Sequence, residues 1–369
     1  MAQLLKLTLS DFRNYERLVW SPDASLVVLT GENGSGKTNL LESLSLLTPG
    51  RGLRGAPLAQ LGRDSATAWG ISARFSFDQD ILELGTGMAG AGEAARRVFL
   101  LNGQQVRNRD ALEDTLSAVW ITPQMDRLFS EGTSGRRRFL DRLVMAVTPH
   151  HARELMAYDR AMTQRNKLLQ TRFSEASWLG GLEASMARHG VAIAAGRREM
   201  VQQLCLFAQS SLGAFPSVDV TLMCGVADQL EHAPALAVED WLREQLATNR
   251  QQDRERGRAT FGVHRMDFRL ADLQTGLLAA TASTGQQKTL LMGVVLAHAK
   301  LVEDYRGTPP VLLLDEPLVH LDRSRRGSLL EIIKDFRTTV ILTGTDEEPF
   351  EDLQARARFV ALKHGEFLG

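Results

Sequence analysis

A run of glycines followed by a lysine and a hydroxyl residue is the stretch of the chain best suited to hold a phosphate. Residues 31–38 read Gly-Glu-Asn-Gly-Ser-Gly-Lys-Thr and follow the apolar run Leu26–Leu29. Glycines let backbone N–H groups turn inward around an anion, and the helix start that follows adds unpaired N–H groups and a positive dipole end. This is the P-loop pattern, in which Lys37 reaches the β- and γ-phosphates of a nucleotide and Thr38 places its hydroxyl on Mg²⁺. The nucleotide contacts predicted from it are Gly31, Glu32, Asn33, Gly34, Ser35, Gly36, Lys37, Thr38 and Asn39.

Two carboxylates stand at the end of a second apolar run. Residues Val311–Leu314 are continuously apolar, as expected for a strand in the middle of a parallel sheet, and Asp315 and Glu316 follow them. Beside a P-loop, Asp315 would hold Mg²⁺ through water and Glu316 would accept a proton from the attacking water. The sequence therefore predicts that the bound nucleotide can be hydrolysed.

A serine at a predicted helix start supplies a third group. Ser283-Thr284-Gly285-Gln286 precede the carboxylates in the chain, and Leu321-Asp322 follow them. By itself, a serine in this place is an ordinary N-cap. The order phosphate loop, Ser-x-Gly-Gln, Asp-Glu, Leu-Asp resembles the ABC ATPases, where the serine of one subunit meets the γ-phosphate held by the other. This resemblance implies two ATP molecules between the subunits of a head-to-tail homodimer, with Ser283, Gly285 and Gln286 against the nucleotide.

Composition bounds the classes of protein to which these residues can belong. The chain has 369 residues, 44% hydrophobic and 24% charged, with a formal net charge of -1; these are ordinary globular values that do not point to a partner. Its two cysteines, Cys205 and Cys224, cannot form a disulfide framework in a chain of this size. No run of about eighteen apolar residues occurs. We therefore expect a soluble, unprocessed, cytoplasmic protein with no membrane partner.

The periodicity of the surrounding residues predicts the elements that position these groups. Residues 5–9 alternate leucine with polar residues and predict a half-buried strand, and residues 67–105 alternate again and predict an antiparallel β-lobe over the nucleotide. Residues 133–212 have apolar residues at helical spacing, with a break near Pro149 and a turn near Gly180-Gly181, and predict a helical lobe. The expected fold is α/β: an ABC-type P-loop ATPase head, with a mixed parallel core sheet and an antiparallel β-lobe, and an inserted α-helical lobe. We expect residues 1–125 to form the N-terminal part of the ATPase lobe, 126–258 the inserted helical lobe, and 259–369 the C-terminal part of the ATPase lobe.

Six short motifs sharpen the resemblance. They read DFRNY, WITPQ, RRRFLD, QRNKLL, GVHR and STGQQK, at residues 11–15, 120–124, 136–141, 164–169, 262–265 and 283–288. Over nearly the whole chain, these motifs resemble RecF, a bacterial family of recombination-mediator ATPases built like the heads of SMC proteins without the long coiled coil. The resemblance implies a protein that binds DNA as an ATP-bound homodimer at single-strand gaps and ssDNA–dsDNA junctions. It also implies that the protein helps RecO and RecR to load RecA in recombinational repair, replication restart and SOS induction, and that slow, DNA-stimulated ATP hydrolysis releases it.

The same resemblance implies roles for residues outside the nucleotide motifs. Gln124 would link the helical lobe to Mg²⁺ and the γ-phosphate. Arg13, Asn14 and Arg54 would add nucleotide contacts. The predicted catalytic set is Lys37, Gln124, Ser283 and Glu316, and the predicted metal set is Thr38, Gln124 and Asp315.

DNA contact has to come from local basic clusters, because the net charge is near zero. Arg136, Arg137 and Arg138 crowd one predicted helix start and are the residues that we predict to contact DNA phosphates. The alternative is that these arginines form ion pairs within the protein, for example with Asp141. A second cluster, Arg323–Arg326, follows the Leu-Asp element.

Departures from the expected patterns include the carboxylate strand end and Thr343–Asp346. Many RecF members end the carboxylate strand with two aspartates, whereas Asp315-Glu316-Pro317 is closer to transporter ATPases. The switch histidine of those transporters has no counterpart in Thr343–Asp346. The alternatives left open are the ATPase subunit of an ABC transporter and a structural DNA clamp that binds ATP without turning it over. A small-molecule P-loop kinase does not explain the motif at Ser283.

Overall fold

The structure of the chain, a computed structural model, describes residues 2–63, 66, 68–77, 80–89, 96–106, 109–112, 115–171, 175–209 and 212–368. Contacts within the chain divide it into two units. The first unit comprises Met1–Arg127, Ser210–Ser217 and Ala282–Gly369, and the second comprises Leu128–Gln209 and Val218–Thr281. Residue 67, the predicted start of the β-lobe, and residues 210 and 211 near the predicted end of the helical lobe lie outside the described residues.

A buried, mostly parallel sheet forms the core of the first unit. Its strands are β3 (Leu26–Thr30), β8 (Ala118–Ile121), β11 (Val311–Leu314), β12 (Val340–Gly344), β13 (Arg358–Lys363) and β14 (Glu366–Leu368). They are ordered β14-β13-β3-β12-β11-β8, and all pairings are parallel except that of β13 with β14. Every residue of β3, β8 and β11 is buried, which explains why these strands are continuously apolar. The loops that follow β3 and β11 therefore leave the same edge of the sheet, with β12 between them.

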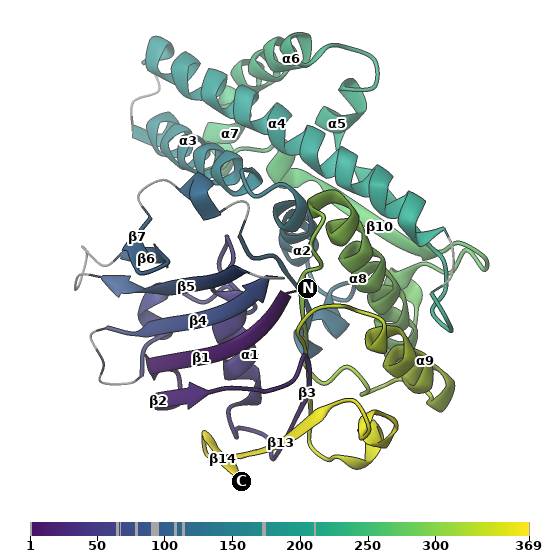
Figure 1. Ribbon diagram of the computed structural model, residues 1–369. Helices are drawn as coiled ribbons and strands as arrows, with labels where there is room; N and C mark the ends of the chain where they lie inside the picture. The colour runs from purple at the N-terminus through teal and green to yellow at the C-terminus, as the bar shows by residue number, and fades with distance from the viewer. Residues whose placement is uncertain are drawn as a thin grey trace. The chain divides into compact units, whose positions relative to one another are not determined.

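A second sheet of the first unit is antiparallel, as predicted for the β-lobe. Its strands are β1 (Ala2–Phe12), β2 (Tyr15–Trp20), β4 (Gly70–Phe77), β5 (Asp80–Ala89), β6 (Arg96–Leu101) and β7 (Gln104–Gln105). Their order is β2-β1-β4-β5-β6-β7, and Figure 1 shows the first four side by side. The register of β1 against β4 shifts between Leu4 and Lys6. Because of this shift, Leu4 is buried and Leu5 is 36% exposed, although the alternation predicted Leu5 on the same face as Leu7.

Three α-helices of the first unit flank the segments of interest. They are α1 (Lys37–Ser45), α8 (Thr284–Arg306) and α9 (Arg323–Lys334), and the short 3-10 helices are η1 (Leu58–Gln60), η3 (Arg109–Leu112), η4 (Pro123–Arg127) and η7 (Glu348–Leu353). Helix α8 is buried over most of its length, ends at Gly307 in the left-handed conformation, and packs against β8 and η4. This packing places the start of α8 in the same unit as the two carboxylates.

The second unit is mainly helical, as predicted. Its elements are α2 (Thr133–Val147), α3 (His151–Thr171), α4 (Ala176–Ala208), β9 (Val218–Met223), α5 (Gly225–Gln229), α6 (Ala235–Thr248), α7 (Arg250–Arg256), η5 (Val263–Arg265), β10 (Asp267–Asp272) and η6 (Ala279–Thr281). Helices α3 and α4 pack along each other (Figure 1). Strand β9 pairs with β10 in an antiparallel ribbon. The predicted division at residues 125 and 258 stays a prediction; by its contacts, the segment 259–281 groups with the helical unit.

One prediction for this unit is wrong. The break near Pro149 separates α2 from α3, but the turn predicted at Gly180-Gly181 does not exist, because both glycines lie inside the 33-residue helix α4. Glycine inside a helix costs only about 1 kcal/mol relative to alanine. The packing of α4 along α3 and α6 outweighs that cost.

A buried ion-pair cluster holds three helices of the second unit together. Arg165 on α3 is fully buried and donates to Glu183 on α4 at 3.0 Å and to Asp253 on α7 at 2.7 Å. Its remaining nitrogen donates to the carbonyl oxygen of Leu246 at 2.6 Å. The arginine of the QRNKLL motif is therefore part of the fold of this unit.

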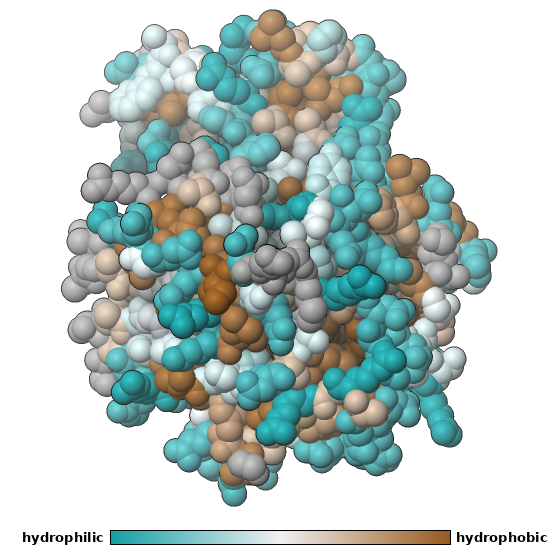
Figure 2. All heavy atoms as spheres, in the orientation of Figure 1, coloured by the Kyte–Doolittle hydropathy of each residue, from teal (hydrophilic) through white to brown (hydrophobic). Residues whose placement is uncertain are grey.

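None of the described helices is both long and apolar enough to cross a membrane. On the face drawn in Figure 2, hydrophilic and apolar side chains are interspersed rather than gathered into one apolar belt.

Candidate nucleotide-binding site

The loop between β3 and α1 has the backbone of a phosphate cradle. Gly31, Gly34 and Gly36 all have positive φ, at 145°, 84° and 113°. A Cβ atom on Gly31 would lie 2.1 Å from the carbonyl oxygen of Leu362, and one on Gly36 would lie 2.6 Å from the Tyr15 hydroxyl. Glycine is required at both positions by conformation and by space. Gly36 takes the N-cap position of α1 without a side-chain cap, which suits the first turn of the helix to an anion.

Lys37 is folded into this loop. Its side chain is almost fully buried, and Nζ donates to the carbonyl oxygens of Gly31 at 2.5 Å and Glu32 at 3.0 Å. Burial lowers the pKa of Lys37, and the nearby carboxylates Glu316 and Asp315 oppose that shift. The ammonium group thus lies inside the cradle, where an anionic phosphate is a stronger hydrogen-bond acceptor than a carbonyl oxygen.

Two threonine hydroxyls meet Asp315 at the edge of the core sheet. Thr38, at the start of α1, donates to both carboxylate oxygens of Asp315 at 3.0 Å, and Thr343, in β12, donates to Oδ1 at 2.8 Å. Burial raises the pKa of Asp315, and the two hydroxyl hydrogen bonds oppose the shift. Hydroxyl and carboxylate oxygens next to a phosphate cradle are the donors that Mg²⁺ uses in such sites, so the residues present fit that ion.

Hydrogen bonds to its backbone N–H and carbonyl groups fix the conformation of Glu316. Its φ is +48°, in the left-handed region that a residue with a side chain rarely adopts. Its N–H donates to Thr343 Oγ1 at 2.9 Å, and its carbonyl oxygen accepts from Lys288 Nζ at 2.9 Å. The backbone conformation of the proposed proton acceptor is therefore set by hydrogen bonds on both sides.

The Ser283 motif begins α8 with an exposed cap. The Ser283 N–H donates to Gln286 Oε1 at 2.9 Å and the Gln286 N–H donates to Ser283 Oγ at 3.4 Å, which is a complete capping box. Ser283, Thr284 and Gln286 are nevertheless exposed. A Cβ atom on Gly285 would lie 3.1 Å from the carbonyl oxygen of His320, so the motif lies close to the loop that follows Glu316.

Gln124 lies near this edge of the sheet but does not contact a site residue through any described hydrogen bond. It is exposed, in η4 after β8, and β8 is the neighbour of β11. The Asp315 N–H donates to the carbonyl oxygen of Ile121 at 3.0 Å, which joins the two strand ends. Its predicted role toward Mg²⁺ and the γ-phosphate stays a prediction.

A buried glutamate that the sequence reasoning missed engages the arginines predicted to contact phosphate. Arg13 donates to both oxygens of the fully buried Glu42 at 2.8 Å, and Arg54 donates to Glu42 at 2.9 Å and to Asn39 at 2.6 Å. Asn39 in turn donates to Asn14 at 2.7 Å. The predicted nucleotide contacts Arg13, Asn14, Asn39 and Arg54 thus form one network with Glu42 of α1. The sequence feature that could have indicated this buried network is a carboxylate, Glu42, directly after the apolar residues Leu40 and Leu41.

The predicted DNA-contacting arginines differ in their surroundings within the second unit. Arg136 donates to both oxygens of Asp267, at 2.7 and 2.9 Å. Arg137 donates to the Thr133 hydroxyl at 2.7 Å and to the carbonyl oxygen of Met266 at 3.0 Å. Arg138 is exposed, and within the described part of the chain it has no hydrogen bond or ion pair. Arg138 is therefore more accessible to an external phosphate than Arg136, which is paired with Asp267.

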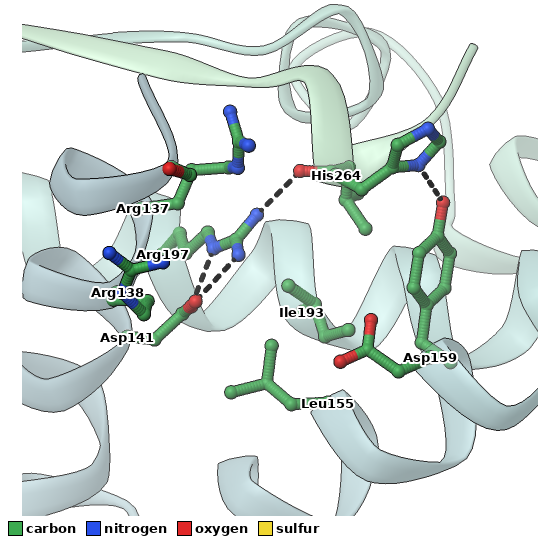
Figure 3. Close-up of a pocket in the computed structure, with 11 residues that line it drawn as sticks. Arg137, Arg138, Asp141, Leu155, Asp159, Ile193, Arg197 and His264 are labelled. Carbon is green, nitrogen blue, oxygen red and sulfur yellow. Dashed lines mark hydrogen bonds and ion pairs between the residues drawn. The ribbon is translucent and has the colours of Figure 1, made fainter. Parts of the chain in front are cut away.

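Arg137 and Arg138 also border a cavity of about 270 Å³ in the second unit. Figure 3 shows the two arginines on one side, Asp159 and His264 on the other, and Leu155 and Ile193 between them. Arg197 also lines this cavity, but it is paired with Asp141 at 2.7 and 2.8 Å.

Comparisons with known proteins show the family to which the chain belongs. The family model of the RecF/RecN/SMC N terminal domain matches residues 3–366. A protein of Mesorhizobium japonicum named DNA replication and repair protein RecF is 42% identical over 364 residues, which cover 98% of this chain and 96% of that protein. The chain belongs to the RecF family. A second RecF relative, from Rhizobium meliloti, is 42% identical over 369 residues and covers 99% of this chain and 98% of its own length.

Solved structures support the same RecF fold. The structure of a recombination mediator protein RecF with ATP, of the RecFOR pathway, has a TM-score of 0.82 at 22% identity and covers 100% of this chain and 99% of its own. An SMC head bound to the C-winged helix domain of ScpA has a TM-score of 0.53 at 13% identity and covers 99% of this chain and 97% of its own. The predicted ABC-type α/β head is confirmed.

Proposed function

We propose that this RecF-family chain is an ATP-dependent DNA-binding protein of recombinational repair and replication restart. In this proposal it acts at single-strand gaps and ssDNA–dsDNA junctions, where with RecO and RecR it helps to load RecA and so supports SOS induction. The support is the 42% identity, over nearly its full length, to proteins named DNA replication and repair protein RecF. Those names favour a repair protein over the transporter ATPase suggested by Asp315-Glu316-Pro317.

The main support for the proposed dependence on ATP is that three chain segments meet at one edge of the core sheet. Thr38 of the P-loop, Asp315 after β11 and Thr343 of β12 are joined by hydrogen bonds of 2.8–3.0 Å. In the proposal, Lys37 binds the β- and γ-phosphates of ATP, and Thr38 and Asp315 hold Mg²⁺. Such an ion would offset the negative charge of the phosphate oxygens.

Glu316 is the proposed general base. It directly follows the metal-side aspartate, and a carboxylate there can accept a proton from water. Gln124 is proposed to approach the same site. Hydrolysis would be slow and stimulated by DNA, and it would serve as a switch that ends the DNA-bound state.

Dimerisation is proposed to depend on Ser283. The motif is an exposed helix start, and its capping box engages only the N–H groups of Ser283 and Gln286, so the other N–H groups of the first turn and the Ser283 hydroxyl can face a phosphate held by a second copy of the chain. ATP would then be the contact between the two copies, arranged head to tail. DNA binding would follow dimerisation, with Arg138 in the footprint.

Sedimentation velocity with and without ATP and Mg²⁺ tests this proposal. We expect the unaltered protein to shift from monomer to dimer with ATP, and Ser283→Arg to bind ATP with unchanged affinity but remain a monomer. Thr221→Arg, which adds the same side chain at an exposed hydroxyl residue of β9, is the control and should dimerise. The proposal fails if the unaltered protein stays monomeric with ATP, or if Ser283→Arg dimerises normally.

A further inference from the structure

A buried lysine that the P-loop pattern does not use lies next to the proposed general base. Lys288 is in the second turn of α8, the helix that begins at Ser283, and it is only 1% exposed. A lysine is almost never this buried unless its charge is compensated. The partners of this ammonium group therefore indicate what it does.

Those partners belong to the two segments that carry proposed catalytic residues. Nζ of Lys288 donates to the carbonyl oxygen of Glu316 at 2.9 Å and lies 3.7 Å from Oδ2 of Asp126. Asp126 lies in η4 with Gln124, and among the described residues its buried Oδ1 has no hydrogen-bond partner. One side chain thus joins α8 both to the turn at Glu316 and to the segment that carries Gln124.

The bond to Glu316 acts on an uncommon backbone conformation. With φ at +48°, Glu316 has a left-handed conformation, and its carbonyl oxygen also accepts from the Val319 N–H at 3.4 Å. A left-handed residue with a side chain persists only where its surroundings fix it. Thr343 fixes the N–H of Glu316, and Lys288 fixes the carbonyl.

We propose that Lys288 is a positioning residue for Glu316, and that it links the orientation of the Glu316 carboxylate to helix α8. The proposal deepens the function proposed above and rests on it for the roles of Glu316 and Ser283. The same helix presents Ser283 to the second subunit and holds the subunit's own general base. Docking of the partner is thereby coupled, through a rigid helix, to the site that performs hydrolysis.

Lys288→Met tests this, because methionine has a similar length and no charge. Lys300→Met, on the exposed face of the same helix, is the matched control. We expect kcat for ATP hydrolysis with DNA to fall by about a hundredfold, the cost of roughly an ångström of misplacement, with KM changed by less than about twofold. Lys288→Arg keeps a donor for the Glu316 carbonyl and should recover part of the kcat.

Hydrogen–deuterium exchange without nucleotide provides a second readout. In Lys288→Met, we expect faster exchange confined to residues 316–322, and in Lys300→Met no change. If removal of Lys288 alone lowers the stability of the fold, Lys288→Met/Asp126→Asn removes both charges and should show the same local change. Unchanged exchange at 316–322, or a change spread evenly over the first unit, overturns the proposal. Because this measurement needs no ATP, it tests Lys288 even if the unaltered protein proves unable to hydrolyse ATP, which would refute the proposed function instead.

Discussion

The arginine cluster at the start of α2 contains one arginine that stabilises the second unit, Arg136, and one that is available to DNA, Arg138. Arg136 is 12% exposed and forms a two-pronged ion pair with Asp267, which is 21% exposed. Arg138, two residues along the helix, is exposed. Single substitutions Arg136→Ala and Arg138→Ala should therefore have different effects, although both remove one positive charge from the same turn.

The expected magnitudes follow from these contacts. Each phosphate neutralised by a protein cation contributes about 0.9 to the slope of log affinity against log salt for duplex DNA. Arg138→Ala should reduce that slope by about 0.9. A fourfold rise in salt should therefore weaken DNA binding by the variant by a factor that is about 3.5 times smaller than for the unaltered protein. Arg136→Ala should leave the slope unchanged and lower the unfolding free energy by about 1.5–3 kcal/mol, because it removes a charged hydrogen-bond pair and leaves Asp267 without its cation.

Fluorescence anisotropy of a gapped duplex, titrated with the ATP-bound protein at several salt concentrations, measures the slope, and denaturant unfolding measures the stability. Arg160→Ala, at an exposed position of α3, is the control for a general loss of charge. An unchanged slope for Arg138→Ala would remove Arg138 from the DNA footprint. A reduced slope for Arg136→Ala with normal stability would show that the Asp267 ion pair opens when DNA binds, and would refute the division of roles between the two arginines.

Two further predictions concern a carboxylate in each unit. Glu316→Gln should lower ATP hydrolysis by about a hundredfold or more while an ATP-bound dimer still forms; turnover at the normal rate would show that Glu316 is not the general base. Burial alone would raise the pKa of Asp141, but a hydrogen bond from His151 and the Arg197 guanidinium outweigh it and hold that pKa below its ordinary value. The stabilisation from Asp141 is therefore present above its unfolded pKa of about 3.9 and is lost as the pH falls through the lower folded pKa. Acid unfolding followed by circular dichroism should show Asp141→Asn less stable at neutral pH and less sensitive to acid, and an identical acid transition would contradict this.

Features that depend on a few neighbouring residues could be predicted from the sequence. The P-loop needs glycine at Gly31 and Gly36 because of backbone angles and of space next to them, so the spacing alone indicated the cradle. The cap at Ser283 needs a glutamine three residues later, and Gln286 stands there. The β-lobe could be predicted because an antiparallel sheet with one buried face imposes alternation.

Features that depend on residues far apart in the chain could not be predicted in the same way. An arginine has the same sequence signature whether it binds DNA or an aspartate 131 residues away, as Arg136 does with Asp267. The helix α4 runs through Gly180-Gly181 because its packing against other helices outweighs a local preference for a turn. Lys288 is the last residue of the STGQQK motif, but its contact depends on the turn at Glu316, 28 residues further on.

The carboxylate strand end is where the separate parts of the first unit meet. Thr38 reaches Asp315 from the start of α1, and Thr343 reaches both Asp315 and Glu316 from β12. Lys288 reaches Glu316 from α8. A shift of α1 on filling the cradle and a shift of α8 on docking of a second copy would therefore act on two adjacent residues joined by one rigid peptide group. Because the proposed metal ligand and the proposed base are neighbours in sequence, a movement of either helix would disturb the contact of the other, and the proposed ATP binding and dimerisation would then share one point of control.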